Sequence, residues 1–303
     1  MFRSLFLAIW AGAFLPGFAP GDEINFVAYN LKNYLKMERR VDGELREYAP
    51  KPEAEIDELI KIIVATAPDV LGICEIGDSA DLDDLKRRLG EAGLSYPHVE
   101  LTIAADETRH LALLSKFPIV ARDSKTDLSY RIGEKELPFQ RGILDVTLEI
   151  GDGYQLRCLG VHLKSKRPVE EADQALMRRS EAELLRAHID EILAARADTN
   201  LIVYGDFNET RNEVPIKVIR GRFGTATALT DIQLADVRGD RWSYSWRYAD
   251  LYARFDFVFA SKGLVPEILQ EESRIHHGGP NWYEASDHRP LVVRIDAVDR
   301  EVK

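Results

Sequence analysis

Short apolar runs with the length of β-strands recur along the whole chain, and polar residues directly follow several of them. These runs predict strands over residues 24–29, 70–76, 111–115, 144–150, 154–163, 201–205, 242–247, 254–259 and 291–295. Apolar residues at helical spacing predict helices over residues 53–67, 82–92, 170–195 and 214–220. Strands mixed with helices at these intervals predict an α/β chain with two sheets packed together and helices outside them.

Some local features sharpen this prediction. In the first helix Ile56, Leu59, Ile60, Ile63 and Val64 fall on one face, and Pro68 ends it. The long third helix has a buried stripe of Leu185, Ile189, Ile192 and Leu193. Residues 32–52 are polar and irregular, which predicts a surface excursion, and Asp152-Gly153 predicts a hairpin turn.

The first residues resemble an export signal. Arg3 precedes an apolar stretch over residues 5–18, and Ala19-Pro20-Gly21 provides a small-x-small cleavage pattern. We therefore expect a signal peptide over residues 1–21, one domain over 22–298 and a short tail over 299–303. An uncleaved membrane anchor is the alternative. After signal removal we expect a periplasmic or secreted monomer with no stable membrane insertion.

Charge and cysteine content narrow the function classes. The 303-residue chain has a formal charge of −11, which argues against tight, non-specific binding of duplex nucleic acid through a basic surface. It does not argue against cleaving phosphodiesters, because bound cations can supply local positive charge.

Cys74 and Cys158 lie in predicted core strands, so we expect two buried free thiols. Strand alternation points Cys74 away from the site and Cys158 towards it.

Asp206-Phe207-Asn208 directly follows the predicted strand 201–205, which ends at Gly205. A rigid strand end can hold two short polar side chains in place. Asp206 can orient or deprotonate a water molecule, and Asn208 can donate a hydrogen bond to a phosphoryl oxygen. The alternative is a simple Asx-type turn, for which these residue types are common.

A second pair of motifs combines a histidine with a carboxylate. Asp287-His288 precedes the strand 291–295, and Asp256 lies in the aromatic run 254–259. Alternation puts Asp256 on the face opposite Phe255 and Phe257, and a buried carboxylate requires a partner. His288 is the natural candidate, while a salt bridge from Arg254 to Asp256 and a solvated loop histidine remain the alternatives.

Three more strand ends deliver polar groups. His162 and Lys164 end one strand, Glu75 another and Asn30 the first. The histidine and lysine can meet phosphate oxygens, although a lone histidine is often structural. Mg²⁺ prefers oxygen ligands, so it is a suitable partner for Glu75.

In this order, the motifs resemble those of the endonuclease/exonuclease/phosphatase superfamily, which includes deoxyribonuclease I and bacterial sphingomyelinases. The resemblance covers nearly everything after the signal. Cys-Glu replaces the usual Gln-Glu at residues 74–75, and Tyr-Asn replaces Trp-Asn at residues 29–30. Both departures keep the chemical groups intact.

This resemblance implies a four-layer α-β-β-α sandwich of two mixed sheets. It also implies in-line attack of water on a phosphate ester, with Mg²⁺ as cofactor and Mn²⁺ or Ca²⁺ as alternatives. Its implied metal ligands are Asn30, Glu75 and Asp287. Its implied catalytic residues are Asp206 as base, Asn208, His162 and His288 as stabilisers of negative charge, and Asp256 as the residue that orients His288.

The substrate is less constrained. We expect Lys164 and Trp246 to contact it, although the strand over residues 242–247 could instead bury Trp242, Tyr244 and Trp246. Arg178 and Arg179 are expected on a solvated helix face. A nuclease or nucleotide phosphodiesterase acting on DNA or RNA is the first hypothesis. A phosphatase or phospholipase acting on inositol phosphates or sphingomyelin is the second, and an inactive binding module is the third.

Overall fold

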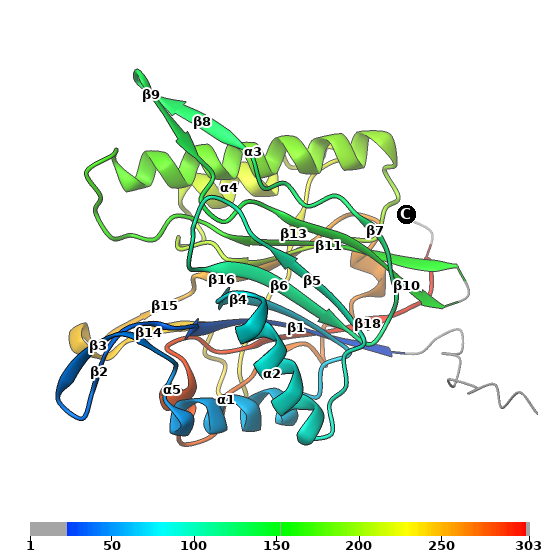
Figure 1. Ribbon diagram of the computed structural model, residues 1–303. Coiled ribbons are helices and arrows are strands. Elements are labelled where there is room, and N and C mark those ends of the chain that lie inside the picture. Colours follow the sequence, from blue (N-terminus) through cyan, green and yellow to red (C-terminus); the bar gives the residue numbers. More distant parts are fainter. Residues whose placement is uncertain (1–22, 152, 301–303) are drawn as a thin grey trace, which may run out of the picture.

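Two six-stranded sheets face each other in the computed structural model, which describes residues 23–151 and 153–300 (Figure 1). The first sheet has the order β17 (Arg274–Ile275), β18 (Leu291–Asp296), β1 (Glu23–Tyr34), β4 (Val70–Ile76), β6 (His110–Ser115) and β5 (His98–Thr102). The second has the order β13 (Thr230–Asp231), β16 (Asp256–Ala260), β12 (Leu201–Asp206), β11 (Tyr154–His162), β10 (Leu144–Gly151) and β7 (Ile119–Arg122). Both sheets mix parallel and antiparallel neighbours.

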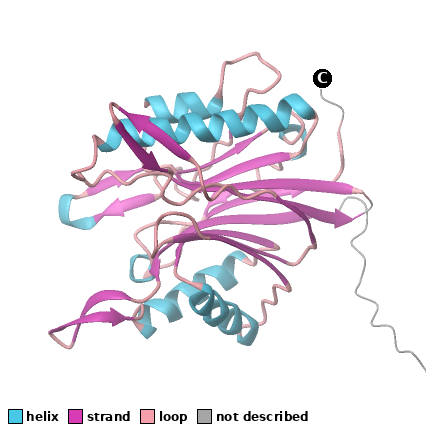
Figure 2. Ribbon diagram, turned by 45° about the horizontal axis from the view of Figure 1, so that its top comes forward, coloured by secondary structure: helices cyan, strands magenta, loops and turns pink. Residues whose placement is uncertain are grey.

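Helices cover the outer face of each sheet. The first sheet is covered by α1 (Glu53–Thr66) and α2 (Ser79–Glu91), and the second by α3 (Gln174–Ala195) and α4 (Val214–Arg220), as both views show (Figures 1 and 2). The remaining short helices are η1 (Arg247–Ala249), η2 (Val265–Glu267) and α5 (Trp282–Ala285). The result is the α-β-β-α sandwich that the resemblance implied.

Side-chain alternation along the strands builds three apolar layers. On β12, Ile202 and Tyr204 belong to the cluster between the sheets, whereas Leu201 and Val203 belong to the cluster under α3. A third cluster lies between the first sheet and α1 and α2. Strands covered on both faces can be apolar at every position, which explains why the strand signals in the sequence are continuous runs.

Helix boundaries follow identifiable caps. At its end, α1 is followed by Ala67 in the left-handed conformation (φ 45°), and its buried face is Ile56, Leu59, Ile62, Ile63 and Thr66. The predicted stripe was wrong at Val64, which is 37% exposed, whereas Ile60 is half-buried and packs against the apolar cluster between the first sheet and α1. The stripe predicted for α3 is confirmed. An Asp78 capping box starts α2 earlier than predicted, at Ser79.

The excursion over residues 32–52 is more ordered than the sequence indicated. The first strand continues to Tyr34, and a hairpin of β2 (Met37–Val41) and β3 (Glu44–Ala49) follows it. A second hairpin, β8 (Ser129–Ile132) with β9 (Lys135–Pro138), was not predicted either. These hairpins lie outside the large sheets and bury few side chains, so they lack an apolar signal.

The hairpins β2–β3 and β14–β15, formed by β14 (Tyr244–Trp246) and β15 (Leu251–Ala253), project from the same end of the molecule (Figure 1). Cys74 and Cys158 are buried and free, as predicted. Asp152, the predicted signal over 1–21 and residues 301–303 lie outside the described part of the chain. Within the described part, no helix combines the length and apolarity needed to cross a bilayer.

Candidate active site

Polar side chains from both sheets meet where the layer between the sheets ends. On β11 and β12, which run parallel, His162 pairs in register with Asp206, and Asp206 pairs with Asp256 of β16. Alternation places Asp206 on the same face as Ile202 and Tyr204, facing the other sheet. From that other sheet, β1 contributes Asn30. The predicted site residues are thus brought together by strand ends and not by sequence proximity.

Asp206 lies at the centre of this cluster. Its Oδ2 atom accepts a hydrogen bond of 3.1 Å from Asn30 Nδ2, and it lies 3.6 Å from His162 Nε2 and 3.7 Å from His288 Nε2. Asn30 Nδ2 also lies 3.2 Å from Glu75 Oε1. Asn30, Asp206 and both histidines are each at most 5% exposed. Any water that reaches Asp206 will therefore be surrounded by these polar groups.

The predicted pairing of His288 with Asp256 is confirmed. His288 Nδ1 lies 2.7 Å from Asp256 Oδ2, which leaves Nε2 directed to Asp206. Two buried serines hold the pair: the backbone N–H of His288 donates to Ser286 Oγ, and that of Asp256 donates to Ser243 Oγ. The alternative partner Arg254 pairs instead with Asp231, at 2.6 Å.

A bulge redirects Glu75 into the site. Between Asn30 and Tyr34 the register of β1 with β4 shifts, and Glu75 has a left-handed backbone (φ 64°). Such bulges re-aim side chains next to active sites. Cys74 faces the layer between the sheets, so the prediction that it points away from the site was wrong. The prediction failed because the bulge interrupts the simple alternation of side chains. Its thiol contacts the Val161 carbonyl at 3.5 Å.

Burial and charge set the ionisation of the three central groups. Burial raises the pKa of Asp206 to about 7; the charge of His288 opposes this rise, and Asp256 and Glu75 add to it. Burial would lower the pKa of His288, but Asp256 and Asp206 outweigh it and hold the pKa well above its usual value. Burial, with the positive charges of Arg141 and His288, holds the pKa of His162 well below its usual value. These shifts favour the charged form of His288 and the neutral form of His162.

The other predicted site residues are placed as follows. Asn208 has a left-handed backbone, its N–H donates to Asp206 Oδ1 at 2.8 Å, and its Nδ2 donates to the Leu163 carbonyl at 3.1 Å. Asp287 is half-buried beside His288, and its charge contributes to the raised pKa of that histidine. Asn208 therefore orients Asp206 through its backbone N–H, while its side-chain amide holds the Leu163 carbonyl.

Lys164 and the long helix differ from expectation. The Lys164 ammonium lies 3.1–3.3 Å from oxygens of its own loop, at Ser165 and Arg167, so it stabilises that loop. Arg178 is not solvated: it is 2% exposed and pairs with Glu209 at 3.0 Å. The expectation holds for its neighbour Arg179, whose side chain is 55% exposed.

In the aromatic run over residues 242–246, the serines are the buried residues and the aromatic residues are not. Ser243 and Ser245 are buried, whereas Trp246 is 49% exposed. Tyr244 stacks on Phe255, with ring centroids 4.9 Å apart, and lies 5.0 Å from the His288 ring. The hairpin β14–β15 therefore forms part of the rim of the site, with Trp246 available to a ligand.

Two arginines at the site were missed by sequence reasoning. Arg109 precedes β6, and its Nε donates to Asn33 Oδ1 at 2.7 Å. Arg141 pairs with Asp106 at 2.9 Å, and both arginines lower the pKa of His162. Neither follows an apolar strand, which was the signal that identified the other residues.

The donor atoms fit a hard divalent cation. Glu75 and Asp206 present carboxylate oxygens, a ligand type that Mg²⁺ prefers, whereas Asn30 directs its Nδ2 to both carboxylates and its Oδ1 accepts from the Lys32 N–H. In the described part of the chain, no lysine or arginine forms an ion pair with Glu75 or Asp206. Another acidic group, Asp123, Asp145 and His188, is already neutralised by Arg157, which lies 2.5 Å from Asp145.

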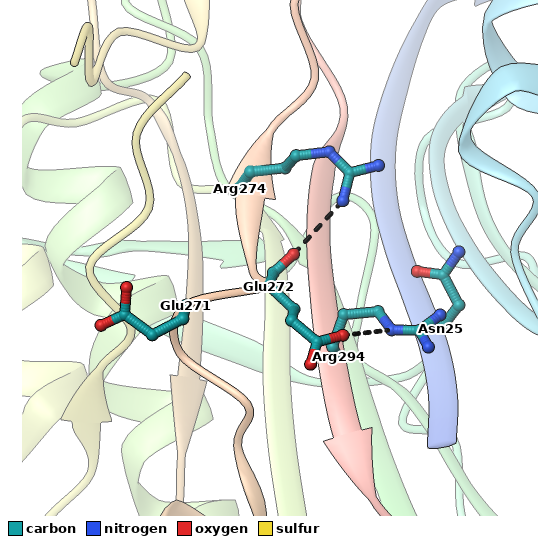
Figure 3. A pocket seen from close by; sticks show the side chains of 5 residues that line it. All are labelled: Asn25, Glu271, Glu272, Arg274 and Arg294. Atoms are coloured by element: carbon teal, nitrogen blue, oxygen red, sulfur yellow. Dashed lines mark hydrogen bonds and ion pairs between the residues drawn. The ribbon is translucent and has the colours of Figure 1, made fainter. Parts of the chain in front are cut away.

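A separate hollow of about 320 Å³ lies at the start of β1, lined by Asn25, Glu271, Glu272, Arg274 and Arg294 (Figure 3). Asn25 precedes Asn30 by five strand residues, or roughly 16 Å. Its two arginines are matched by two glutamates, and Arg274 donates to the Glu272 carbonyl at 3.2 Å. The hollow is thus distinct from the candidate active site and has no excess charge that would select an ionic ligand.

Comparison with known proteins now identifies the family. The model of the Endonuclease/Exonuclease/phosphatase family matches residues 27–288. The chain belongs to this family. The match includes every residue of the site, from Asn30 to His288. No curated protein matches the chain.

Solved structures of family members share the fold at low sequence identity. TDP2 from C. elegans is 16% identical with a TM-score of 0.61, and the match covers 91% of this chain and 75% of that one. The human Nocturnin catalytic domain with bound sulfate is 20% identical with a TM-score of 0.62 (90% and 93% covered). Sphingomyelinase C from Streptomyces griseocarneus is 17% identical with a TM-score of 0.56 (91% and 100% covered). These likenesses show that the chain shares the fold of these proteins.

Proposed function

We propose that this chain is an exported, divalent-metal-dependent phosphodiesterase that hydrolyses its substrate by in-line attack of water, acting on nucleic acid or nucleotides. The observation that carries the proposal is the buried Asp206 carboxylate, held between His162, His288 and Asn30. Its raised pKa, about 7, suits a general base at neutral pH.

In this mechanism each residue has one task. Asp206 binds the attacking water and accepts its proton, while the Asn208 N–H fixes the Asp206 carboxylate. His288 is held charged by Asp256 and stabilises negative charge on the phosphoryl oxygens, and neutral His162 can donate a hydrogen bond to them. Removing one such donor typically costs ~10²–10³ in rate.

A divalent cation would be held by Glu75, with Asn30 and Asp287 as further ligands. When bound, it would polarise the phosphoryl oxygens and stabilise the leaving oxygen. We propose Mg²⁺, with Mn²⁺ or Ca²⁺ as alternatives, because the ligands are oxygens.

The rim of the site supports a nucleic-acid or nucleotide substrate. Trp246 is half exposed, and Tyr248 and Tyr252 on the same hairpin are 87% and 59% exposed. Exposed aromatic rings can stack on unpaired bases, which contributes ~1–3 kcal/mol per base. Nearby, Arg247 and Lys32 lie over the Tyr283 ring and supply positive charge for a phosphate backbone. We also propose that the mature protein is monomeric and either periplasmic or secreted.

A phospholipase or phosphatase is the second candidate. The same exposed aromatic hairpin favours it, because tyrosine and tryptophan also suit the interface of a membrane. An inactive binding module is a weaker proposal, because binding alone does not require Asp206, His288 and Asp256 together.

One set of assays tests these proposals. Purified protein lacking residues 1–21 is incubated with Mg²⁺, Mn²⁺ or Ca²⁺ and with plasmid, a single-stranded oligonucleotide, bis-p-nitrophenyl phosphate, inositol phosphates or sphingomyelin vesicles. We expect EDTA-sensitive cleavage of the nucleic acids, absent in Asp206→Asn. Turnover of lipid or inositol phosphate alone would support the second candidate, and inactivity towards every substrate would contradict enzymatic function.

The Trp246→Ala variant separates the two roles of the rim. We expect it to raise KM for the oligonucleotide about tenfold without changing kcat, as the loss of one stacked base implies. Tyr48→Ala is the control, since Tyr48 is 81% exposed on the other hairpin. Loss of vesicle binding with unchanged oligonucleotide kinetics would instead favour a lipid substrate.

A further inference from the structure

The peptide group between Lys32 and Asn33 links a buried lysine to the proposed metal ligand. The Lys32 carbonyl accepts a hydrogen bond from Lys51 Nζ at 3.1 Å, and the Asn33 N–H donates to Glu75 Oε2 at 2.9 Å. In a planar trans peptide these two groups point in opposite directions. The ammonium and the carboxylate therefore hold the same peptide from its two sides.

This peptide has an unusual backbone conformation. Lys32 and Asn33 are both left-handed, with φ of 51° and 58°, and they lie in the bulge opposite Glu75. A left-handed backbone costs roughly 1–2 kcal/mol for a residue with a side chain, so other contacts must stabilise it. Arg39 Nη2 donates to the Asn33 carbonyl and Arg109 Nε to the Asn33 side chain, each at 2.7 Å.

Lys51 is buried to an unusual degree for a lysine. The residue is 1% exposed, and its ammonium also lies 3.1 Å from Glu55 Oε2. Lysine is almost never fully buried without a partner, because its charge must leave water. Glu55 neutralises that charge, and the Lys32 carbonyl gives the ammonium a fixed direction.

If the plane of the Lys32–Asn33 peptide were flipped, its interactions with Lys51 and with Glu75 would both be reversed. Its carbonyl would face the Glu75 carboxylate, and its N–H would face the Lys51 ammonium, so both contacts would become repulsive. Lys51 thus favours the orientation in which Glu75 Oε2 accepts a hydrogen bond. Asn30 Nδ2 binds the other oxygen, Oε1, at 3.2 Å, so both oxygens of the carboxylate are oriented from β1.

We propose that Lys51 is a positioning residue that acts through the Lys32–Asn33 peptide to fix Glu75 for binding a divalent cation. This inference rests on the proposed function, in which Glu75 is a metal ligand. Residues that orient metal ligands typically contribute 10–100-fold to metal affinity.

The test measures Mg²⁺ and Mn²⁺ binding by calorimetry for the wild type, Lys51→Met and Lys51→Gln. Methionine keeps the unbranched stem without a donor, and glutamine is too short to reach the carbonyl. We expect both variants to raise Kd about tenfold, with kcat at saturating metal within about twofold of wild type. The control is Lys61→Met, because Lys61 is 68% exposed on α1 and pairs with Glu58, and its Kd should not change.

A second readout uses protein labelled with ¹⁵N-asparagine and kept free of metal. Lys51→Met and Glu75→Gln should each shift the Asn33 amide proton upfield, because each weakens the hydrogen bond that it donates. An unchanged Asn33 amide and unchanged Kd in folded Lys51 variants would overturn the proposal, even if their melting temperature fell. If the wild type bound no metal, the proposed function would fail, while a shifted Asn33 amide would still establish the link between Lys51 and Glu75.

Discussion

Of the carboxylates that favour the charged form of His288, Asp256 acts most strongly. Since Nδ1 lies 2.7 Å from Asp256 Oδ2, Asp256→Asn keeps the size of the partner but removes its negative charge. We expect kcat to fall about 10²-fold, as for the loss of one charge-stabilising group. The His288 pKa, measured by NMR titration, should fall at the same time. Asp250→Asn, in an exposed turn, is the control and should change neither quantity.

Asp206 should make the metal-free protein sensitive to rising pH. Its pKa is about 7 in the folded protein and near 4 in an unfolded chain, so the folded state holds the proton more tightly. The stability from this proton is complete below pH 4 and is lost as pH rises through about 7. Asp206→Asn mimics the protonated form, and we expect it to be more stable than wild type at pH 7.5 by on the order of 4 kcal/mol.

Urea unfolding in EDTA at pH 5 and pH 7.5 measures this difference. Glu181 also has a pKa raised to about 7 by burial, so the wild type and the variant share its contribution. The difference between the two proteins therefore reports Asp206 together with its interaction with His288. If the wild type and Asp206→Asn lost the same free energy of unfolding between pH 5 and pH 7.5, Asp206 would already be ionised in the folded protein at pH 5.

At the scale of elements, a buried ion pair holds the loop after β11. Arg178 on α3 pairs with Glu209 and donates to the Ser165 carbonyl at 3.1 Å. Arg178→Ala would leave the buried Glu209 paired only with the exposed Lys166, so it should lower the free energy of unfolding by about 1–3 kcal/mol. Arg179→Ala, one position along the same helix, should change it by less than about 0.5 kcal/mol. Similar effects of both variants on urea midpoints would contradict this role for the pair.

The elements also show which features the sequence could reveal. Strands β4, β11, β12, β16 and β18 are buried on both faces, so continuous apolar runs marked them and the polar residues at their ends. The hairpin β2–β3 has no such run, because nearly all its side chains are exposed or half-buried. The direction of the Glu75 side chain could not be predicted from the sequence either, because a bulge with three left-handed residues overrides the simple alternation of side chains.

At the scale of the whole molecule, the two sheets are close enough for one aromatic ring to fill the space between them. Tyr204 on β12 packs against Phe26 on β1, with ring centroids 4.9 Å apart, and the ring lies against Gly72 and Gly160. Alternation predicted the buried face of residues 144–150 and the opposite faces of Asp256 and Phe257, but it failed at Cys74 and over residues 242–246. It could not predict that Gly72 and Tyr204 meet, because strand pairing and sheet stacking determine that contact.

Gly72 thus sets how closely the sheets approach, and adding one methyl group there tests the whole sandwich. A Cβ atom at Gly72 would lie 2.1 Å from Cε2 of Tyr204, whose ring is buried and packs against Phe26. We expect Gly72→Ala to destabilise the protein by about 2–3 kcal/mol through overpacking. Gly90→Ala is the matched control: a Cβ at Gly90 meets nothing within 4 Å and lies in α2, so it should stabilise by about 0.5–1 kcal/mol. In urea unfolding, the change in the free energy of unfolding should therefore have opposite signs for the two alanine substitutions. An equal change for both would mean that the sheets can separate without a cost in free energy.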